Sequence, residues 1–440
     1  MSSPRQDAWL RRDHAHLWHP FTQADEWESQ SDNLVIARGD GVWLEDVDGR
    51  RYLDGTASLW CNVLGHRHPR IDAAIQAQLG RIAHSTMLGL THPGAIEHAE
   101  RLSEHTGLPR VFYSDSGSTA VEVALKMAFQ GKQQVGEVRR TRFAAFTEAY
   151  HGDTVGSVSL GGIDLFHAVY RPLLFDAVRL PAPDAADPED EARCLASIRR
   201  LLGEHGDTLA AVVVEPLVQG AAGLRHHSPA FLREVAALTR EVGAFLVVDE
   251  VATGFGRTGP MFASVGAGVQ PDFLCVAKAI TGGYLPLAAT LTTEAVYDAF
   301  RGPYTDYRTF FHGHTYTGNP LAIAAANATL DVYAEERVLE QLPGRIAALQ
   351  EALARLDEPW VAGVRQVGLM AAVELQRTDG TPYAPHERAG HRASLAARKH
   401  GAIVRNLGDR VMVMPPLVME PPELRAVVAA LAAGAAEVCG

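Results

Sequence analysis

The chain contains few cysteines, and those it has are scattered. Its 440 residues include four of them, Cys61, Cys194, Cys275 and Cys439, and no two form a closely spaced pair. This pattern argues against a zinc ribbon and a disulfide framework, and it is typical of proteins from a reducing compartment. Residues 1–18 also lack the apolar core of a signal peptide. We therefore expect a cytoplasmic protein.

Long apolar runs and clustered basic residues are missing as well. The longest nearly apolar run, residues 426–436, is shorter than the ~20 residues that a membrane-spanning helix needs, and it is better interpreted as a C-terminal helix that packs one face. The chain has 40 basic and 52 acidic residues, which gives a net charge of −12. A nucleic-acid-binding protein would instead carry a clustered basic face. We expect neither a membrane nor a nucleic acid as a partner.

The middle of the chain alternates short apolar segments with amphipathic helical patterns. Continuous apolar runs such as those at residues 209–214 and 245–249 are typical of strands that are buried on both faces. The pattern predicts an α/β fold with a mostly parallel sheet that is covered by helices on both sides. Residues 34–54 instead resemble a β-meander with turns at Gly41 and Gly49.

These differences predict two domains. Residues 76–335 would form the large domain. A smaller α+β domain would be assembled from both chain ends, with residues 1–75 as its N-terminal part and residues 336–440 as its C-terminal part.

Several polar residues follow directly after predicted strands. Glu215 ends one apolar run, Asp249 ends a second, and Lys278 ends a third. In open α/β sheets, ligands bind outside the carboxyl ends of the strands. A buried ammonium group is costly unless it is paired or has lost its proton, which makes Lys278 conspicuous. Taken alone, Lys278 could extend to the surface and Asp249 could cap a helix.

Two further features support a binding site at this edge of the sheet. The segment "DSGST" at residues 115–119 opens a predicted helix, whose N-terminal amides can bind a phosphate, although plain capping by Ser118 or Thr119 also fits. Tyr150 follows a strand and could stack on a planar ring or lie in the core. A phosphate cradle, an aromatic ring, a carboxylate and a desolvated lysine together match the needs of pyridoxal 5′-phosphate. Lys278 would form the Schiff base as a neutral amine.

Other motifs in the chain support competing functions less well. "GFGRTG" at residues 254–259 matches a dinucleotide fingerprint, but five residues separate it from the preceding strand and the following acidic residue comes too early. "FLVVDE" resembles an ATPase motif, but no P-loop accompanies it. The histidine pairs lack the partners of a zinc site, so we expect no metal. These pairs are His66 and His68, His226 and His227, and His312 and His314.

The assembled motifs resemble those of the class III pyridoxal-phosphate-dependent aminotransferases of fold type I. The resemblance covers residues 17–416 and is most specific in "FLVVDEVATGFGRTG" and "PDFLCVAKAITGGYLP". Within that class, "LWHPFTQ", "DSGSTAVEVALKMAFQ", "AYHGDTVGSVSLG" and "HGHTYTGNPLA" resemble the group that aminates 8-amino-7-oxononanoate to 7,8-diaminononanoate in biotin synthesis. The resemblance implies that Lys278 binds the cofactor covalently, Asp249 contacts its pyridine nitrogen, and Tyr150 stacks on its ring. Gly117 and Ser118 would hold the phosphate.

The resemblance also implies a homodimer. His314 and Thr315 would reach the phosphate from a second subunit, which places the cofactor at a two-fold interface. Arg405 would bind a substrate carboxylate, for which its planar fork is suited. Gly313 and Asp153 would lie near the substrate and the stacking tyrosine.

Two positions depart from the family pattern. The substrate site commonly has two adjacent tryptophans where this chain has Leu59 and Trp60, and it often has tyrosine where this chain has Phe21. Most members of the group take the amino group from S-adenosylmethionine and some take it from lysine, so both donors stay open. The alternatives are another ω-amino acid or diamine aminotransferase, a non-catalytic relative and, more distantly, a dehydrogenase.

Overall fold

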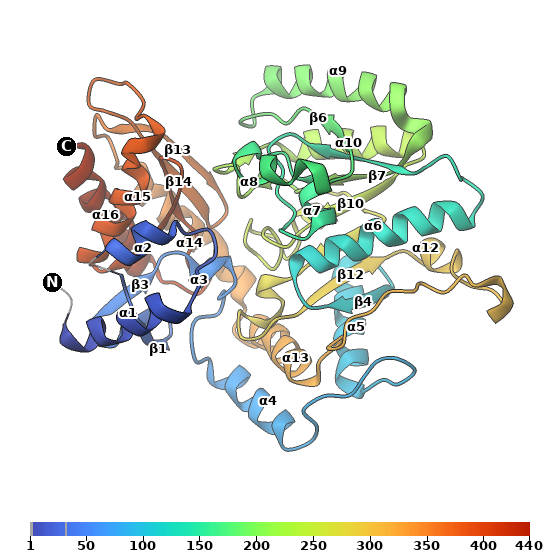
Figure 1. The fold of residues 1–440 in the computed structure, drawn as a ribbon, viewed down its shortest axis with the longest axis horizontal. Coiled ribbons are helices and arrows are strands. Elements are labelled where there is room, and N and C mark those ends of the chain that lie inside the picture. Colours follow the sequence, from blue (N-terminus) through green and yellow to red (C-terminus); the bar gives the residue numbers. More distant parts are fainter. Residues whose placement is uncertain (1–2, 31–32) are drawn as a thin grey trace.

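A seven-stranded sheet forms the centre of the molecule. The computed structural model describes residues 3–30 and 33–440 (Figure 1). The strand order is β4-β12-β11-β10-β7-β5-β6, and only β12 runs antiparallel to its neighbours. This confirms the predicted mostly parallel sheet. The strands span Arg110–Ser114 (β4), Ala288–Thr292 (β12), Phe273–Val276 (β11), Phe245–Asp249 (β10), Leu209–Val214 (β7), Arg142–Phe146 (β5) and Val178–Leu180 (β6).

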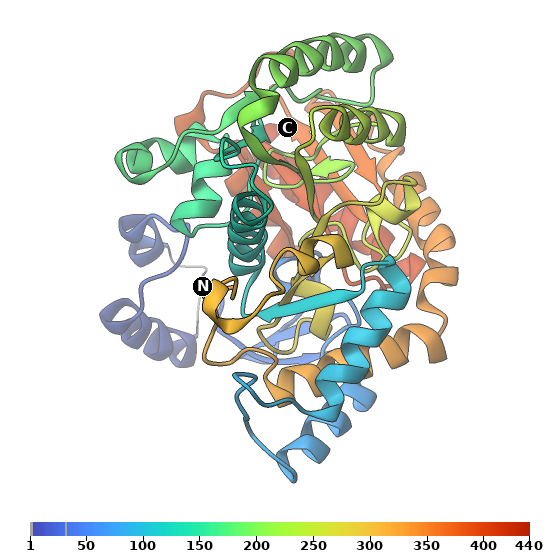
Figure 2. The same cartoon turned by 90° about the vertical axis from the view of Figure 1, so that its right-hand side faces the viewer.

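Alternate residues of the central strands enter two separate apolar clusters, one on each face of the sheet. Val213 and Val247 pack with helix α6 (Gly117–Gln134), while Val212 and Val248 pack with α10 (Pro229–Glu241). Every residue of β7 is buried, as expected for a strand covered on both sides. In both views, α9 (Pro188–His205) and α4 (Pro69–Leu79) lie at opposite ends of the molecule (Figures 1 and 2).

The two ends of the chain lie together beside the central sheet (Figure 1). Strands β1 (Ile36–Asp40), β2 (Trp43–Asp46) and β3 (Arg51–Asp54) form the predicted meander, and β15 (Ala402–Ile403) adds to β3 in parallel. A further sheet has the order β13-β14-β17-β16. Its strands are Val361–Val367 (β13), Met370–Leu375 (β14), Arg410–Val413 (β17) and Arg405–Leu407 (β16). The division at residues 75 and 335 stays a prediction.

The remaining elements connect these sheets and cover them. The helices are α1 (Pro4–His16), α2 (Ala24–Ser29), α3 (Ala57–Trp60), α5 (Pro93–Thr106), α7 (Val155–Leu160), α8 (Asp164–His167), α11 (Ala263–Gly266), α12 (Glu294–Asp298), α13 (Pro320–Glu335), α14 (Val338–Leu353), α15 (Ala389–Lys399) and α16 (Pro421–Cys439), and the short strands are β8 (Val218–Gln219) and β9 (Arg225–His226). Helix α16 contains the apolar run 426–436 and buries one face, as predicted. Within residues 3–30 and 33–440, no helix has the length and apolar character needed to cross a membrane.

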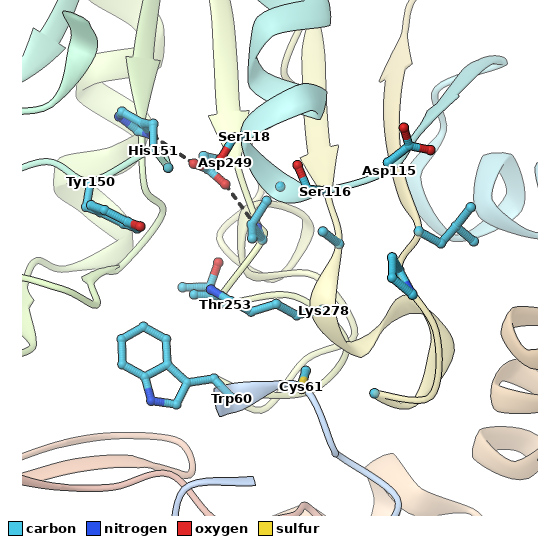
Figure 3. A pocket seen from close by; sticks show the side chains of 18 of the residues that line it. Trp60, Cys61, Asp115, Ser116, Ser118, Tyr150, His151, Asp249, Thr253 and Lys278 are labelled. Carbon is cyan, nitrogen blue, oxygen red and sulfur yellow. Dashed lines mark hydrogen bonds and ion pairs between the residues drawn. The ribbon is translucent and has the colours of Figure 1, made fainter. Parts of the chain in front are cut away.

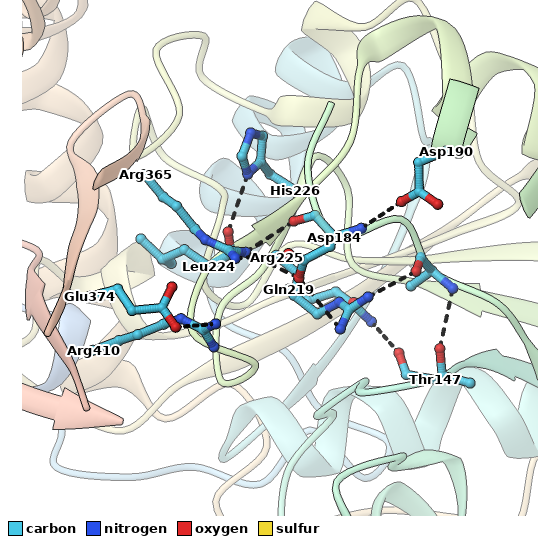
Figure 4. Close-up of polar contacts among 11 residues, drawn as sticks. Thr147, Asp184, Asp190, Gln219, Leu224, Arg225, His226, Arg365, Glu374 and Arg410 are labelled. Carbon is cyan, nitrogen blue, oxygen red and sulfur yellow. Dashed lines mark hydrogen bonds and ion pairs between the residues drawn. The ribbon is translucent and has the colours of Figure 1, made fainter. Parts of the chain in front are cut away.

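A group of arginines and carboxylates joins the C-terminal sheet to the loops beside the central sheet (Figure 4). Arg365 of β13 donates to both carboxylate oxygens of Asp184, at 3.3 and 2.9 Å, and Arg225 lies 3.5 Å from the same group. Burial raises the pKa of Asp184, but hydrogen bonding and charge from Arg365 outweigh it, and the pKa lies below its usual value. Arg410 of β17 pairs with Glu374 at 2.8 Å. These contacts tie the β8–β9 hairpin to the C-terminal sheet.

The "GFGRTG" segment does not form a dinucleotide-binding turn. Residues 254–259 lie in a series of turns, and the next helix, α11, begins only at Ala263. Arg257 is fully buried and donates to the carbonyl oxygens of Leu369 and Pro415, at 3.3 and 2.5 Å. The segment therefore packs against the C-terminal part of the chain and does not connect a strand directly to a helix, as the fingerprint would require.

Candidate active site

A cavity of about 400 Å³ opens at the carboxyl edge of the central sheet (Figure 3). Six of the residues predicted for the site line it: Trp60, Gly117, Ser118, Tyr150, Asp249 and Lys278. They come together because β4, β5, β10 and β11 all end at the same edge. Cys61, Ser116, His151, Glu215 and Thr253 also line the cavity. Of these, Cys61, His151 and Thr253 were not expected in a site from the sequence.

Lys278 enters the cavity from the short 3-10 turn that follows β11. Its φ of 47° lies in the left-handed region, which is uncommon for a residue other than glycine. Burial lowers the pKa of its amine, and the charges of Asp249 and Glu215 oppose that shift only in part. The neutral amine is therefore favoured more than in a lysine at the surface. Its Nζ lies 5.0 Å from the centre of the Trp60 ring.

Asp249 ends β10 and is held by two donors. Its Oδ2 accepts a hydrogen bond from Nδ1 of His151 at 2.7 Å, and its Oδ1 accepts one from the amide of Val251 at 3.0 Å (Figure 3). Burial alone would lower the pKa of His151, but the hydrogen bond and charge of Asp249, with a smaller contribution from Glu215, raise it above its usual value. The two donors therefore orient the carboxylate.

Helix α6 begins at the edge of the cavity. Its N-cap is Ser116, so the alternative of capping by Ser118 or Thr119 names the wrong residues. Ser116 and Thr119 satisfy each other's amides in a capping box. First-turn amides have no intrahelical acceptor, and those of Gly117 and Ser118 belong to the cavity wall. A Cβ at Gly117 would lie 2.6 Å from a side-chain carbon of Val251, so only glycine fits there without movement.

Tyr150 is fixed at both ends. Its hydroxyl donates to Asp153 at 2.7 Å, and its amide donates to Oε1 of Glu215 at 3.1 Å. Burial, together with the hydrogen bond to Asp153, raises the pKa of the phenol well above its usual value, so the hydroxyl stays protonated. Burial also raises the pKa of Glu215 to about 7. The other Glu215 oxygen accepts the amide of Gly220 at 3.0 Å, which ties Tyr150 to the β8–β9 hairpin.

Other predicted site residues do not line the cavity within this chain. Phe21 is 59% exposed and packs against Phe166, with ring centres 5.5 Å apart, and Leu59 is 48% exposed. Arg405 lies in β16, where burial lowers the pKa of its guanidinium and the nearby Tyr150 opposes that shift. Asp153 contacts the site by accepting a hydrogen bond from the Tyr150 hydroxyl and by donating one from its backbone amide to Oγ of Ser118 at 3.2 Å.

The segment that carries Gly313, His314 and Thr315 also lies outside the cavity wall. Gly313 and Thr315 are exposed, and Nδ1 of His314 lies 3.3 Å from a carboxylate oxygen of Asp115. The histidine pairs have ordinary partners; His66, for example, pairs with Asp54 and His68 with Glu336. In the described part of the chain, no group of three or more histidine, cysteine or acidic side chains is arranged to hold a metal ion.

The residues present fit a phosphorylated pyridine aldehyde. Burial lowers the pKa of the Lys278 amine, which makes the neutral form that attacks an aldehyde easier to reach. A carboxylate backed by a histidine of raised pKa can hold a proton on a ring nitrogen. The free amides beside Gly117, where no side chain fits, can receive a phosphate.

Three comparisons with known proteins agree with one another. The family model for class-III aminotransferases matches residues 25–433. A Nitratidesulfovibrio vulgaris protein named adenosylmethionine-8-amino-7-oxononanoate aminotransferase is 57% identical over 94% of this chain and 79% of its own, and a Geobacter sulfurreducens protein of the same name is 48% identical over 94% of both chains. The crystal structure of the Methanocaldococcus jannaschii protein of that name has a TM-score of 0.93 at 38% identity, covering 98% of this chain and 99% of its own.

A second solved structure extends the comparison. An amine transaminase from an uncultivated Pseudomonas species, in its PLP-bound form, has a TM-score of 0.87 at 37% identity and covers 96% of this chain and 99% of its own. The chain therefore belongs to the class-III aminotransferases, a family of pyridoxal-phosphate-dependent enzymes.

Proposed function

We propose that the protein transfers an amino group from S-adenosylmethionine to 8-amino-7-oxononanoate, giving 7,8-diaminononanoate for biotin synthesis. The observation that carries the reaction type is the half-buried Lys278, whose amine has a lowered pKa and faces the same cavity as Asp249 and Tyr150. The choice of substrates is supported by relatives with this name that are 57% and 48% identical along nearly the whole chain. It is also supported by the "LWHPFTQ" opening of residues 17–23.

The cofactor and the protein divide the chemistry between them. Pyridoxal 5′-phosphate, when bound, supplies an electron sink that allows a C–H bond next to the amine to break. Lys278 acts as the nucleophile that binds the aldehyde and afterwards as the base that accepts and returns the proton at its Nζ. Asp249 keeps a proton on the ring nitrogen, and His151 holds Asp249 in place. Tyr150 stacks on the ring.

Different residues would hold the phosphate and the substrate in this proposal. Gly117 and Ser118 bind the phosphate through their amides. Trp60 forms the wall next to Lys278, and Arg405 binds a substrate carboxylate through its planar fork. Asp153 orients Tyr150. We further assign Phe21, Leu59 and Gly313 to the outer part of the substrate channel.

We infer that the protein is a homodimer and that His314 and Thr315 of one subunit complete the phosphate site of the other. Both residues lie outside the cavity of their own chain. Large apolar side chains are exposed nearby: Phe311 of the same segment is 71% exposed, and Leu88, which follows the His84 that bonds the Thr315 carbonyl at 2.9 Å, is 90% exposed. Exposed large apolar side chains support an interface here, because larger apolar patches on a surface mark protein contacts. Light scattering is expected to give about twice the 47.5 kDa mass of the chain, and a monomer that is fully active would contradict the proposal.

Lysine is the second candidate donor, because Leu59 and Phe21 replace residues that are common in relatives that use S-adenosylmethionine. Transfer to the cofactor can be observed in a half-reaction without acceptor. We expect S-adenosylmethionine to bleach the absorbance of the lysine-bound cofactor, and lysine at the same concentration to leave it unchanged. Bleaching by lysine alone would overturn the donor but keep the reaction type. A purified protein that takes up no cofactor would overturn the proposal as a whole.

A further inference from the structure

The loop that carries Trp60 into the cavity has an unusual backbone. Between β3 and α4, the short α3 segment contains three residues with left-handed φ values: 45° at Ala57, 60° at Ser58 and 67° at Trp60. None of them is glycine. Such conformations are costly and persist only where the surroundings enforce them. A group close to the loop must therefore hold it in this conformation.

The carboxylate of Asp54, at the end of β3, is the centre of the loop's hydrogen bonds. Its Oδ1 accepts bonds from the amides of Thr56 and Ser58, at 3.3 and 2.9 Å, and from the Thr56 hydroxyl at 3.2 Å. Its Oδ2 accepts the Ser58 hydroxyl at 2.9 Å and Nε2 of His66 at 3.1 Å. Asp54 has no exposed surface. Burial raises the pKa of Asp54, but the bonds from His66 and Ser58 outweigh it and keep the pKa below its usual value.

His66, which bonds Asp54, also contacts residues on the other side of the loop. Nδ1 of His66 lies 3.2 Å from the side-chain amide of Asn62, and the His66 backbone pairs with Gly41 through two bonds of 3.0 and 2.7 Å. Asn62 in turn packs against the turn that follows Lys278. A Cβ at Gly283 would lie only 2.7 Å from the backbone of Asn62. The loop is therefore fixed to the segment that carries Lys278.

Trp60 is the side chain that this arrangement delivers to the cavity. The residue is 9% exposed, its ring centre lies 5.0 Å from Nζ of Lys278, and a Cβ at Gly220 would approach the ring to 3.2 Å (Figure 3). No side chain in the described residues bonds its Nε1. The ring is thus placed by the backbone of its loop and by packing alone. A change in that backbone would move the ring directly.

We infer that Asp54 is a positioning residue for the substrate site, which holds the 56–62 loop in its strained form so that Trp60 stands beside Lys278. The inference rests on the proposed function for the identity of the substrate, and on geometry for everything else. Asp54 does not line the cavity and acts through the loop. Its charge matters because it accepts five hydrogen bonds from three residues, Thr56, Ser58 and His66, of which an amide side chain could accept only some.

Asp54→Asn tests this inference in the holoenzyme, and Asp46→Asn is the matched control. Asp46 is equally buried, ends the neighbouring strand β2, and accepts the amides of Asp48 and Arg50 at 2.9 Å each and the Tyr52 hydroxyl at 3.0 Å. It organises a turn that has no part in the cavity wall. Both variants replace a buried carboxylate at the end of a strand in the same sheet. Asp54→Asn weakens the loop that carries Trp60, whereas Asp46→Asn weakens a turn outside the cavity wall.

We expect Asp54→Asn to raise KM for the acceptor at least about tenfold with a smaller loss of kcat, because misplacement of a positioning group by about 1 Å can cost about a hundredfold. Hydrogen exchange of the peptide covering residues 55–63 should become about tenfold faster or more, because the loop opens more readily. Asp46→Asn should change neither quantity. Ser58→Ala, which removes only one of the bonds to Asp54, should shift both in the same direction by less.

Equal KM values in wild type, Asp54→Asn and Ser58→Ala, or unchanged exchange at residues 55–63, would overturn the inference. If Asp54→Asn does not fold, the Ser58→Ala result decides. Failure of the proposed function would look different. A wild-type protein without cofactor absorbance would contradict that proposal, while the exchange measurement would still test the role of Asp54.

Discussion

Replacing Lys278 with alanine is expected to abolish the absorbance of the lysine-bound cofactor and to lower kcat more than about 10⁴-fold. General acid–base catalysis alone contributes about 10²- to 10⁴-fold, and in the proposed mechanism the same amine is also the nucleophile. The methyl group of alanine can serve neither purpose. The absorbance spectrum and single-turnover kinetics with the amino donor measure the two losses separately.

Lys132 provides the matched control for this experiment. It is a buried lysine, whose Nζ donates to the carbonyl of Gly243 at 2.9 Å and lies 3.2 Å from Glu137, away from the cavity. Lys132→Ala should cost stability, because it leaves polar groups without their partner, but it should keep the absorbance and the turnover. Retained turnover in Lys278→Ala, or equal losses in both variants, would remove Lys278 from the mechanism.

The layout of the sheet and the ends of its strands could be predicted from local sequence. Strands buried on both faces have to be continuous apolar runs, and parallel strands end at one edge, so polar residues that follow such runs converge. This argument brought together Lys278, Asp249 and Gly117, which lie 161 positions apart at the extremes and line one cavity. It needed no information on side-chain packing.

Contacts that depend on long-range packing could not be predicted in this way. His151 was quoted as part of "AYHGD", but nothing local indicates that its ring bonds Asp249, 98 positions later in the chain. The same is true of Asp54, which ends a short strand like many others and whose role depends on the path of the loop after it. The parallel pairing of β15 with β3 likewise joins segments about 350 residues apart and has no local signature.

The predicted outer substrate residues show a further limit. Phe21, Leu59 and Gly313 were chosen because they match positions in a family, and in the single chain they lie outside the cavity wall. The alignment of motifs transfers the position of a residue along the chain. It gives no information on a second subunit or on a loop movement that would bring that residue to the substrate.

Asp249→Asn is expected to slow proton transfer about 10²- to 10³-fold, the range seen when one preorganised electrostatic group is removed from an active site. The neutral amide cannot stabilise a positive ring nitrogen, so the electron sink weakens. Cofactor affinity should fall much less, because the phosphate and Lys278 contribute most of the binding contacts in the proposed site. Stopped-flow measurement of the half-reaction gives the first quantity, and equilibrium dialysis gives the second.

Asp272→Asn is the control for Asp249→Asn. It distinguishes the loss of charge beside the cofactor ring from the general effect of replacing a carboxylate in the central domain. Asp272 precedes β11 at the opposite, amino-terminal edge of the sheet, and its Oδ2 accepts the amide of Leu246 at 2.8 Å. Burial raises the pKa of its carboxyl group. The amide oxygen of asparagine can still accept the Leu246 amide, so Asp272→Asn should leave the half-reaction as fast as in the wild type. If Asp249→Asn transfers protons as fast as this control, the Asp249 carboxylate is structural, and the proton on the ring nitrogen has another source. His151 would then be the group to test next, because the change at Asp249 removes the acceptor that raises its pKa.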